Sequence, residues 1–390
     1  MARRIGWGTQ AALLLVGLAL LAVGCNSHPV ALEESGGSVT VNEDVTPGGG
    51  EAVDILWVID NSGSMCEEQE SLRENFRHFI TQFSEAGTDF HIGTTTTQMF
   101  ADHDQDAVAR PGHIQAVPQP VPSYLDECHG SEGSGDDQTD GYEPIRSAIE
   151  TVVDSCAKDP DEWQDLKNLT NGDIDCHLTD GCPTQDDDWE PHELFPVTED
   201  GKQPTWETPA DESPYREIPL VMRAEDYENS DGTLDREQLE DDFACMSLVG
   251  TRGYAIEEGL GAAARAVSPD ITGGPVESPS DESAPNHGLI RQDANFSTIF
   301  VTDENDCSGL EDKHLGTKCS SDICSFANHP DTEDSPIDST SKLAERFRTN
   351  LRKSKYPDSS DDVEIAEDEL ILASIHGSWR RYGEHPDNPE

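Results

Sequence analysis

The segment VDILWVIDNSGSM at residues 53–65 constrains the fold of this chain more than any other feature. It begins with a continuous apolar run, which is typical of a parallel strand buried on both faces of a sheet. The run ends in a carboxylate and two hydroxyls spaced two residues apart, at Asp60, Ser62 and Ser64. Open α/β sheets bind ligands at the carboxyl ends of their strands, and oxygen ligands suit hard divalent cations. The segment therefore predicts a metal site at a sheet edge.

Strand and helix patterns alternate along the rest of the chain. Apolar or β-branched runs predict strands at residues 89–97, 296–302 and 369–375, with a possible short edge strand at 112–117 beside the second strand. Apolar residues at helical spacing predict helices over residues 72–83, 234–249, 256–267 and 342–353. This alternation predicts a Rossmann-like α/β fold with a mostly parallel central sheet flanked by helices.

The alternation fails between about residues 120 and 235. This stretch is rich in Asp, Gly and Pro, and only residues 142–155 within it have a helical pattern. A long irregular stretch inside a compact domain predicts an insertion, here an acidic one braced by disulfides, on the surface near the metal edge. We therefore expect one domain over residues 51–390, interrupted by this insertion.

The ten cysteines fit an exported protein in an oxidising compartment. Short loops between Cys176 and Cys182, and between Cys307 and either Cys319 or Cys324, are plausible disulfides. The sequence leaves the connectivity open.

The N-terminus has the pattern of a secretory signal at residues 1–24. A basic start precedes an apolar segment that ends in Gly24 and Cys25. The cysteine resembles that of a bacterial lipobox, which implies that Cys25 is acylated and becomes the mature N-terminus. An uncleaved membrane helix is the alternative, but the apolar segment falls short of the roughly 20 residues that span a bilayer. Residues 25–50 then form a flexible tether.

These features predict an exported protein, lipid-anchored in the cell envelope. Asn26 follows the cysteine, which favours the outer membrane by resemblance to enterobacterial sorting.

The charge of the chain is strongly negative, with 25 Lys and Arg against 80 Asp and Glu, a net charge of −55. This charge excludes nucleic acid as a partner, because no basic surface could offset it. Adaptation to a saline habitat explains the charge better than a reservoir of calcium sites, since runs of acidic residues are usually solvated. Residues 227–238 resemble a calcium-binding EF-hand loop, but Tyr227 and Gln238 occupy the first and last ligand positions. We expect a solvated turn there.

Three separate motifs resemble the metal site of the von Willebrand factor A domain: DNSGSM at 60–65, VGT at 249–251 and VTDENDCS at 301–308. The combination of these motifs also resembles exported bacterial lipoproteins that display such a domain. The resemblance implies a divalent cation, Mg²⁺ or else Mn²⁺ or Ca²⁺. It also implies direct ligation by Ser62, Ser64 and Thr251, with Asp60 and Asp303 holding the ion through water. Thr139, before another predicted helix, is an alternative to Thr251.

Three neutral ligands leave the charge of the ion poorly compensated, so a carboxylate of a partner protein can complete its coordination. We therefore expect a surface-anchored lipoprotein that acts in adhesion or protein interaction. Three alternatives remain open. In the first, the serines serve as caps of the following helix and not as metal ligands. In the second, the protein is an acidic envelope protein whose ion only stabilises the fold. In the third, it is an enzyme with its site in the insertion. We do not expect an enzyme, because the sequence has no HExxH, GxSxG or GxxxxGK[ST] motif.

Overall fold

The structure of the chain is a computed structural model. It describes residues 52–62, 65–99, 110–115, 117–118, 143–170, 174, 194–199, 204, 208–209, 211–251, 253, 257–303, 306, 308, 340–357, 359, 365 and 370–376. The predicted signal segment, the tether and the lipidation site Cys25 lie outside the described residues, as does Ser64 of the predicted metal site. No helix within these ranges is both long and apolar enough to cross a membrane.

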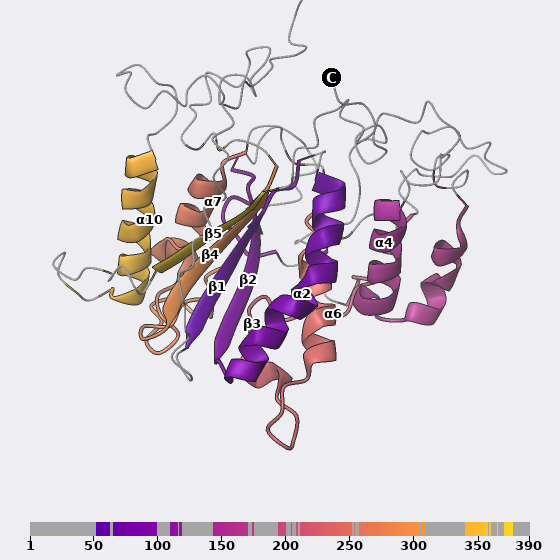
Figure 1. Cartoon of the computed structure of the whole chain (residues 1–390), viewed down its shortest axis with the longest axis horizontal. Helices are drawn as coiled ribbons and strands as arrows, with labels where there is room; N and C mark the ends of the chain where they lie inside the picture. The colour runs from indigo at the N-terminus through magenta and orange to yellow at the C-terminus, as the bar shows by residue number, and fades with distance from the viewer. Residues whose placement is uncertain are drawn as a thin grey trace, which may run out of the picture. The chain divides into compact units, whose positions relative to one another are not determined.

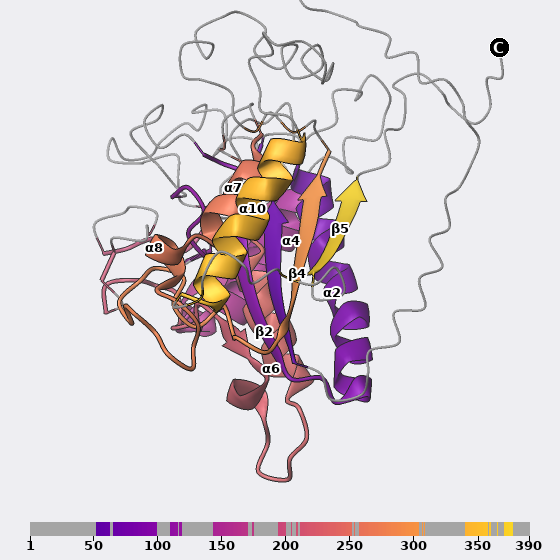
Figure 2. The ribbon, with the colours of Figure 1, turned by 90° about the vertical axis from the view of Figure 1, so that its left-hand side faces the viewer.

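A five-stranded sheet forms the centre of the fold, in the strand order β3-β2-β1-β4-β5 (Figure 1). Its strands are β1 (Val53–Ile59), β2 (Phe90–Thr96), β3 (Met222–Arg223), β4 (Asn295–Thr302) and β5 (Leu370–His376). Of the five strands, only the short β3 is antiparallel to its neighbour, β2. The arrows of β4 and β5 point the same way in Figure 2. The predicted α/β fold with a mostly parallel sheet is confirmed.

The strand β1 lies between β2 and β4, in the middle of the sheet. Its last residue, Ile59, is aligned with Thr96 of β2 and with Val301 of β4. The backbone N–H of Asp60 then donates a hydrogen bond to the carbonyl of Val301 at 2.9 Å. Asp60 is thus held where three parallel strands end together. We call this end of the sheet the carboxyl edge, and the opposite end the amino edge.

Helices cover both faces of the sheet. The α-helices are α2 (Cys66–Ala86), α4 (Glu143–Thr151), α6 (Arg236–Met246), α7 (Gly259–Ala266), α8 (Pro269–Thr272) and α10 (Thr340–Lys355). The shorter helical turns are the π-helix η3 (Val152–Cys156) and the 3₁₀-helices η4 (Pro160–Asn168) and η5 (Ala224–Tyr227). In Figure 1, α2 and α6 lie on one side of the sheet, and α7 and α10 lie on the other.

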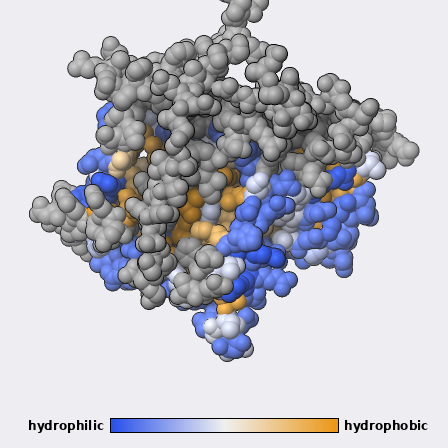
Figure 3. Space-filling view, in the orientation of Figure 1, coloured by the Kyte–Doolittle hydropathy of each residue, from blue (hydrophilic) through white to orange (hydrophobic). Residues whose placement is uncertain are grey.

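Two hydrophobic cores explain the continuous apolar run of β1, because alternate side chains of a strand point to opposite faces. Ile55, Trp57 and Ile59 pack with α2 and α6. Leu56 and Val58 pack with α7 and α10. In the space-filling view the hydrophobic residues lie over the sheet, and the surfaces of the outer helices are mainly hydrophilic (Figure 3).

No strand is formed in the described residues of the predicted edge strand, 112–115 and 117, so this prediction was wrong. The N–H of Gln115 does donate to the carbonyl of Thr94 in β2 at 2.7 Å, so the segment touches β2 at one point. It does not continue as a strand, because Gly112 has a left-handed φ of 70° and the N–H of Ile114 donates to the side-chain oxygen of Asn286 at 2.8 Å. The edge neighbour of β2 is instead β3, which comes from the predicted insertion.

The described residues of the predicted insertion are more regular than expected. Besides α4 and η3, which match the predicted helix at 142–155, they contain η4 and β3. Apolar side chains of this region form their own hydrophobic cluster together with the end of α6. The α4 and η3 part of the insertion therefore packs against α2 and α6, whereas β3 joins the sheet. The expected disulfides of Cys176, Cys182, Cys307, Cys319 and Cys324 lie outside the described residues.

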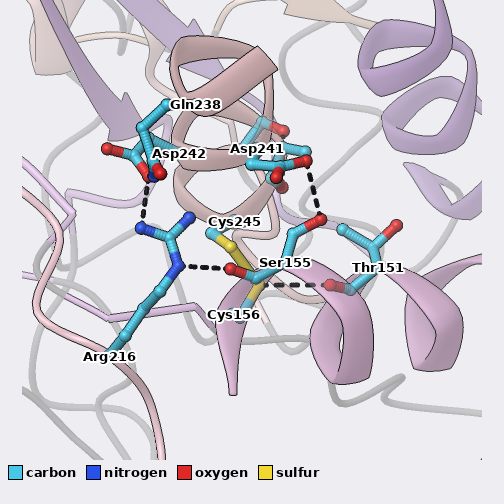
Figure 4. The surroundings of a disulfide bond; sticks show 10 residues. Thr151, Ser155, Cys156, Arg216, Gln238, Asp241, Asp242 and Cys245 are labelled. Atoms are coloured by element: carbon cyan, nitrogen blue, oxygen red, sulfur yellow. Dashed lines mark hydrogen bonds and ion pairs between the residues drawn. A yellow bond between two sulfur atoms is a disulfide. The ribbon is translucent and has the colours of Figure 1, made fainter. Parts of the chain in front are cut away.

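A disulfide that the sequence did not predict joins Cys156, the last residue of η3, to Cys245 near the end of α6 (Figure 4). The two cysteines are 89 residues apart in sequence. Both are fully buried. The bond ties the insertion to the end of α6, just before the chain enters the loop that carries Thr251.

Polar contacts reinforce this junction (Figure 4). The hydroxyl of Ser155 donates to the carboxylate of Asp241 at 3.0 Å. Arg216 forms an ion pair with Asp242 and donates to the carbonyl of Ser155. Tyr227 donates to the other oxygen of Asp242 at 2.6 Å. The end of α6 is therefore held by covalent, ionic and hydrogen-bond contacts.

Candidate metal centre

Asp60 lies at the carboxyl edge with its side chain fully buried. Its Oδ1 accepts a hydrogen bond from the backbone N–H of Ser62 at 2.8 Å, and its Oδ2 accepts one from the hydroxyl of Thr302 at 2.6 Å. Burial raises the pKa of Asp60, hydrogen bonds from Thr302 and Ser62 oppose this, and the nearby carboxylate of Asp303 raises it further. Within the described part of the chain, Asp60 has no basic side chain as a partner.

Ser62 is buried in the loop between β1 and α2. Its hydroxyl forms a hydrogen bond with the Asp60 carboxylate, and its carbonyl accepts a hydrogen bond from the N–H of Met65 at 3.3 Å. A helical turn begins at Met65 and continues into α2 from Cys66, so the alternative role of Ser62 as a cap of this helix stays open beside its proposed role as a ligand.

Asp303 directly follows β4, the neighbour of β1, and is half-buried. It lies close enough to Asp60 for its charge to affect the pKa of that residue. The strand order runs one way from β1 through β2 and the other way from β4 to β5. Asp60 and Asp303 thus flank the point where the order reverses, which is where open α/β sheets bind their ligands.

Thr251 lies in the loop between α6 and α7 and is buried. The carbonyl of Gly250 accepts a hydrogen bond from the side chain of Gln69 at 2.9 Å. On the other side, the N–H of Gly253 donates to the carbonyl of Asn61 at 2.7 Å. A Cβ at Gly253 would lie 2.5 Å from that same oxygen, so the close approach requires glycine. Thr251 is therefore held beside the β1–α2 loop by contacts on both sides.

The loop after β4 also binds the start of α7. Asp306 accepts a hydrogen bond from the N–H of Leu260 at 2.9 Å, and Ser308 accepts one from the N–H of Gly261 at 2.7 Å. Burial raises the pKa of Asp306. These contacts satisfy donors at the first turn of α7, so Asp306 and Ser308 serve as a cap supplied by a distant loop.

Polar residues that the sequence did not single out also shape the carboxyl edge: Asn61, Gln69, Thr302 and Glu257. The side chain of Asn61 donates to Gln98 at 3.2 Å, and the hydroxyl of Thr97 donates to the buried carboxylate of Glu257. Asn61 and Thr302 adjoin predicted ligands in sequence, which is a usable signal. Gln69 and Glu257 carry no such signal, because their roles depend on residues brought close only by folding.

The structure brings together most of the predicted site. Asp60 interacts with both Ser62 and Asp303. The backbone before Thr251 contacts Gln69 of α2, and the backbone after it contacts Asn61 of the β1–α2 loop. Ser64 and the rival Thr139 lie outside the described residues. The described residues contain no group of three or more His, Cys, Asp or Glu side chains that could hold a metal. An ion held by the described residues of this edge would need hydroxyl ligands, a set that suits Mg²⁺, Mn²⁺ or Ca²⁺ rather than zinc or copper.

Comparisons with known protein families and with curated proteins find no match for this chain. The functional interpretation of the carboxyl edge depends on its geometry and chemistry.

Proposed function

We propose that this protein is a binding module of the von Willebrand factor A type that holds a divalent cation at the carboxyl edge of its sheet. The ion is Mg²⁺, with Mn²⁺ or Ca²⁺ as alternatives. Its proposed ligands are Ser62, Ser64 and Thr251, directly through their hydroxyls, and Asp60 and Asp303, through water. The bound ion takes a carboxylate from a protein partner, and a lipid on Cys25 anchors the chain in the cell envelope.

The observation that carries this proposal is a buried carboxylate whose described partners are all neutral. Asp60 accepts hydrogen bonds from one backbone N–H and two hydroxyls, and a second acid, Asp303, lies nearby. A buried charge is costly unless an opposite charge compensates for it. A divalent cation among these oxygens would supply that charge, and the raised pKa of Asp60 would fall on binding.

The choice of ligands explains why such an ion would bind a partner. Hydroxyl oxygens are neutral, so they leave most of the ion's charge uncompensated. Mg²⁺ keeps an octahedral shell of six oxygens and commonly completes it with groups from a substrate or partner. A carboxylate is a strong ligand for such an ion. Partner binding would therefore require the metal, and a chelator would abolish it.

A Ser62→Ala variant tests the site, with Ser283→Ala as a matched control. Ser283 forms the same kind of turn, in which Asp281 Oδ1 accepts hydrogen bonds from its N–H at 2.9 Å and from its hydroxyl at 2.6 Å. That turn is exposed and lies outside the carboxyl edge. In calorimetric titrations with Mg²⁺, we expect Ser62→Ala to weaken binding by about tenfold or more, and Ser283→Ala to leave it unchanged. Equal affinities for the two variants would contradict the assignment.

The partner is tested by a pull-down from envelope extracts in Mg²⁺ and in a chelator, with circular dichroism to confirm that the fold persists. We expect a partner that is retained only with metal. Melting of the domain in chelator without a metal-dependent partner would instead indicate a structural ion.

A further inference from the structure

A buried glutamine joins the two loops that carry the proposed hydroxyl ligands. Gln69 lies in the first turn of α2 and is 4% exposed. Its Nε2 donates to the carbonyl of Asp60 at 3.2 Å and to the carbonyl of Gly250 at 2.9 Å. One of these carbonyls is 9 residues away in sequence and the other is 181 residues away. A single side-chain amide therefore links the start of the β1–α2 loop to the residue before Thr251.

This link acts together with a second one. The hydrogen bond from the N–H of Gly253 to the carbonyl of Asn61 holds the far side of Thr251, and the two backbones are so close there that a Cβ at position 253 would clash with Asn61. Gln69 thus fixes the distance between the β1–α2 loop and the loop of Thr251 on one side of Thr251, and Gly253 fixes that distance on the other side. Gly250 has a left-handed φ of 74°, so the backbone at the first link is tightly bent. Two buried carbonyls would lose their donor if the amide were removed, and buried acceptors left without partners are costly.

We propose that Gln69 is a positioning residue that makes the site selective for Mg²⁺ over Ca²⁺. This inference rests on the proposed function. Mg²⁺ requires a nearly ideal octahedron with oxygen distances of about 2.0–2.1 Å, whereas Ca²⁺ accepts about 2.3–2.6 Å in flexible geometry. Holding the loop of Ser62 at a set distance from the loop of Thr251 favours the smaller ion. If the distance between the two loops can vary, the affinity for Mg²⁺ falls more than the affinity for Ca²⁺.

A Gln69→Met variant tests this proposal, because methionine has similar length but cannot donate a hydrogen bond. Gln238→Met is the matched control: the amide of Gln238 also lies on a helix and donates to Asp242 at 2.7 Å, in the junction with the insertion. We measure the affinities for Mg²⁺ and for Ca²⁺ by calorimetry and the free energy of unfolding by urea titration. We expect Gln69→Met to weaken Mg²⁺ binding by about tenfold and Ca²⁺ binding much less. Gln238→Met leaves the ratio of the two affinities unchanged.

A double-mutant cycle with Thr251→Ala checks that Gln69 acts through this loop. Once the Thr251 hydroxyl is absent, Gln69→Met should weaken Mg²⁺ binding little further, because coupled residues are not additive. If Gln69→Met does not fold, Gln69→Asn keeps the donor but shortens its reach and should also lower the Mg²⁺-to-Ca²⁺ ratio.

An unchanged ratio, with both affinities lowered together or neither lowered, would overturn the role of Gln69 while leaving the metal site intact. Failure of the unmodified protein to bind either ion would overturn the proposed function itself.

Discussion

The two ends of β1 each bury an aspartate completely, but they compensate for it in different ways. At the amino edge, Asp54 accepts hydrogen bonds from the backbone N–H and the Nε of Arg291, both at 2.7 Å. At the carboxyl edge, the described residues that donate hydrogen bonds to Asp60 are all neutral, and Asp303 lies nearby. Both carboxylates are 0% exposed, so solvent screening does not explain the difference.

The contrast separates a structural acid from a candidate ligand-binding acid within one strand. Arg291 also forms an ion pair with Asp89 at 2.6 Å and donates to the carbonyl of Val53 at 2.9 Å, so its guanidinium closes the amino edge with the chain's own charge. No described basic side chain does this for Asp60. Under the proposed function, a cation from solution would supply at the carboxyl edge the positive charge that Arg291 supplies at the amino edge.

The largest effect in this comparison is expected from Arg291→Met. The substitution leaves Asp54 buried without its charged partner, and breaking a buried ion pair from one side typically costs about 3–5 kcal/mol. Urea titration at pH 8, above the raised pKa of Asp54, should show this loss of unfolding free energy. The control is Arg265→Met, which removes a largely exposed pair with Asp270 at 2.8 Å and should cost at most about 1 kcal/mol. Similar losses for both variants would mean that the amino edge does not depend on its buried charge.

A second substitution, Asp60→Asn, should not destabilise the metal-free protein, in contrast to Arg291→Met. Without metal it removes a buried charge that has no basic partner among the described residues, so the unfolding free energy should stay the same or rise. With Mg²⁺ at about 100 times its Kd, the unmodified protein should gain about 2.7 kcal/mol, and the variant should gain much less. Thermal or urea unfolding with and without Mg²⁺ measures both quantities. A loss for Asp60→Asn in metal-free buffer as large as that for Arg291→Met would erase the contrast between the two edges.

The smallest effect concerns pH. Burial raises the pKa of Asp54 to about 7, although Arg291 opposes the shift. The folded state therefore binds this proton more tightly than the unfolded state does, so the stabilisation is complete below the unfolded pKa and is lost as pH rises through 7. We expect the unfolding free energy to fall by about 1 kcal/mol between pH 6 and pH 8 relative to Asp54→Asn. Parallel pH profiles for the two proteins would show that Asp54 does not titrate in this range.

Local sequence patterns predicted the parts of the molecule that depend on local chemistry. The apolar run before Asp60 identified a strand buried on both faces, and the stripe that includes Phe76 identified α2, which packs against it. The three motifs with predicted oxygen ligands lie in loops at the carboxyl edge of a parallel sheet. The topology alone therefore predicts that these loops lie near one another.

Contacts between residues far apart in sequence could not be predicted in this way. The partner of Asp54 is 237 residues away, and Gln69 reaches a carbonyl 181 residues away. Neither residue belongs to a recognisable motif. The pairing of Cys156 with Cys245 could not be predicted either, because short spacings between cysteines favour other pairs and this bond spans 89 residues. The predicted edge strand at 112–117 failed for a related reason, because Asn286 accepts a hydrogen bond from the N–H of Ile114, 172 residues away, in a turn that begins at Gly112.

The bond between Cys156 and Cys245 has a practical consequence for producing this protein. Disulfides persist in oxidising compartments and are rare where thiols are kept reduced. Protein made in a reducing cytosol would lack this disulfide, which holds the end of α6 just before the loop that carries Thr251. Periplasmic or refolded preparations are therefore the appropriate starting point for measurements of ion affinity.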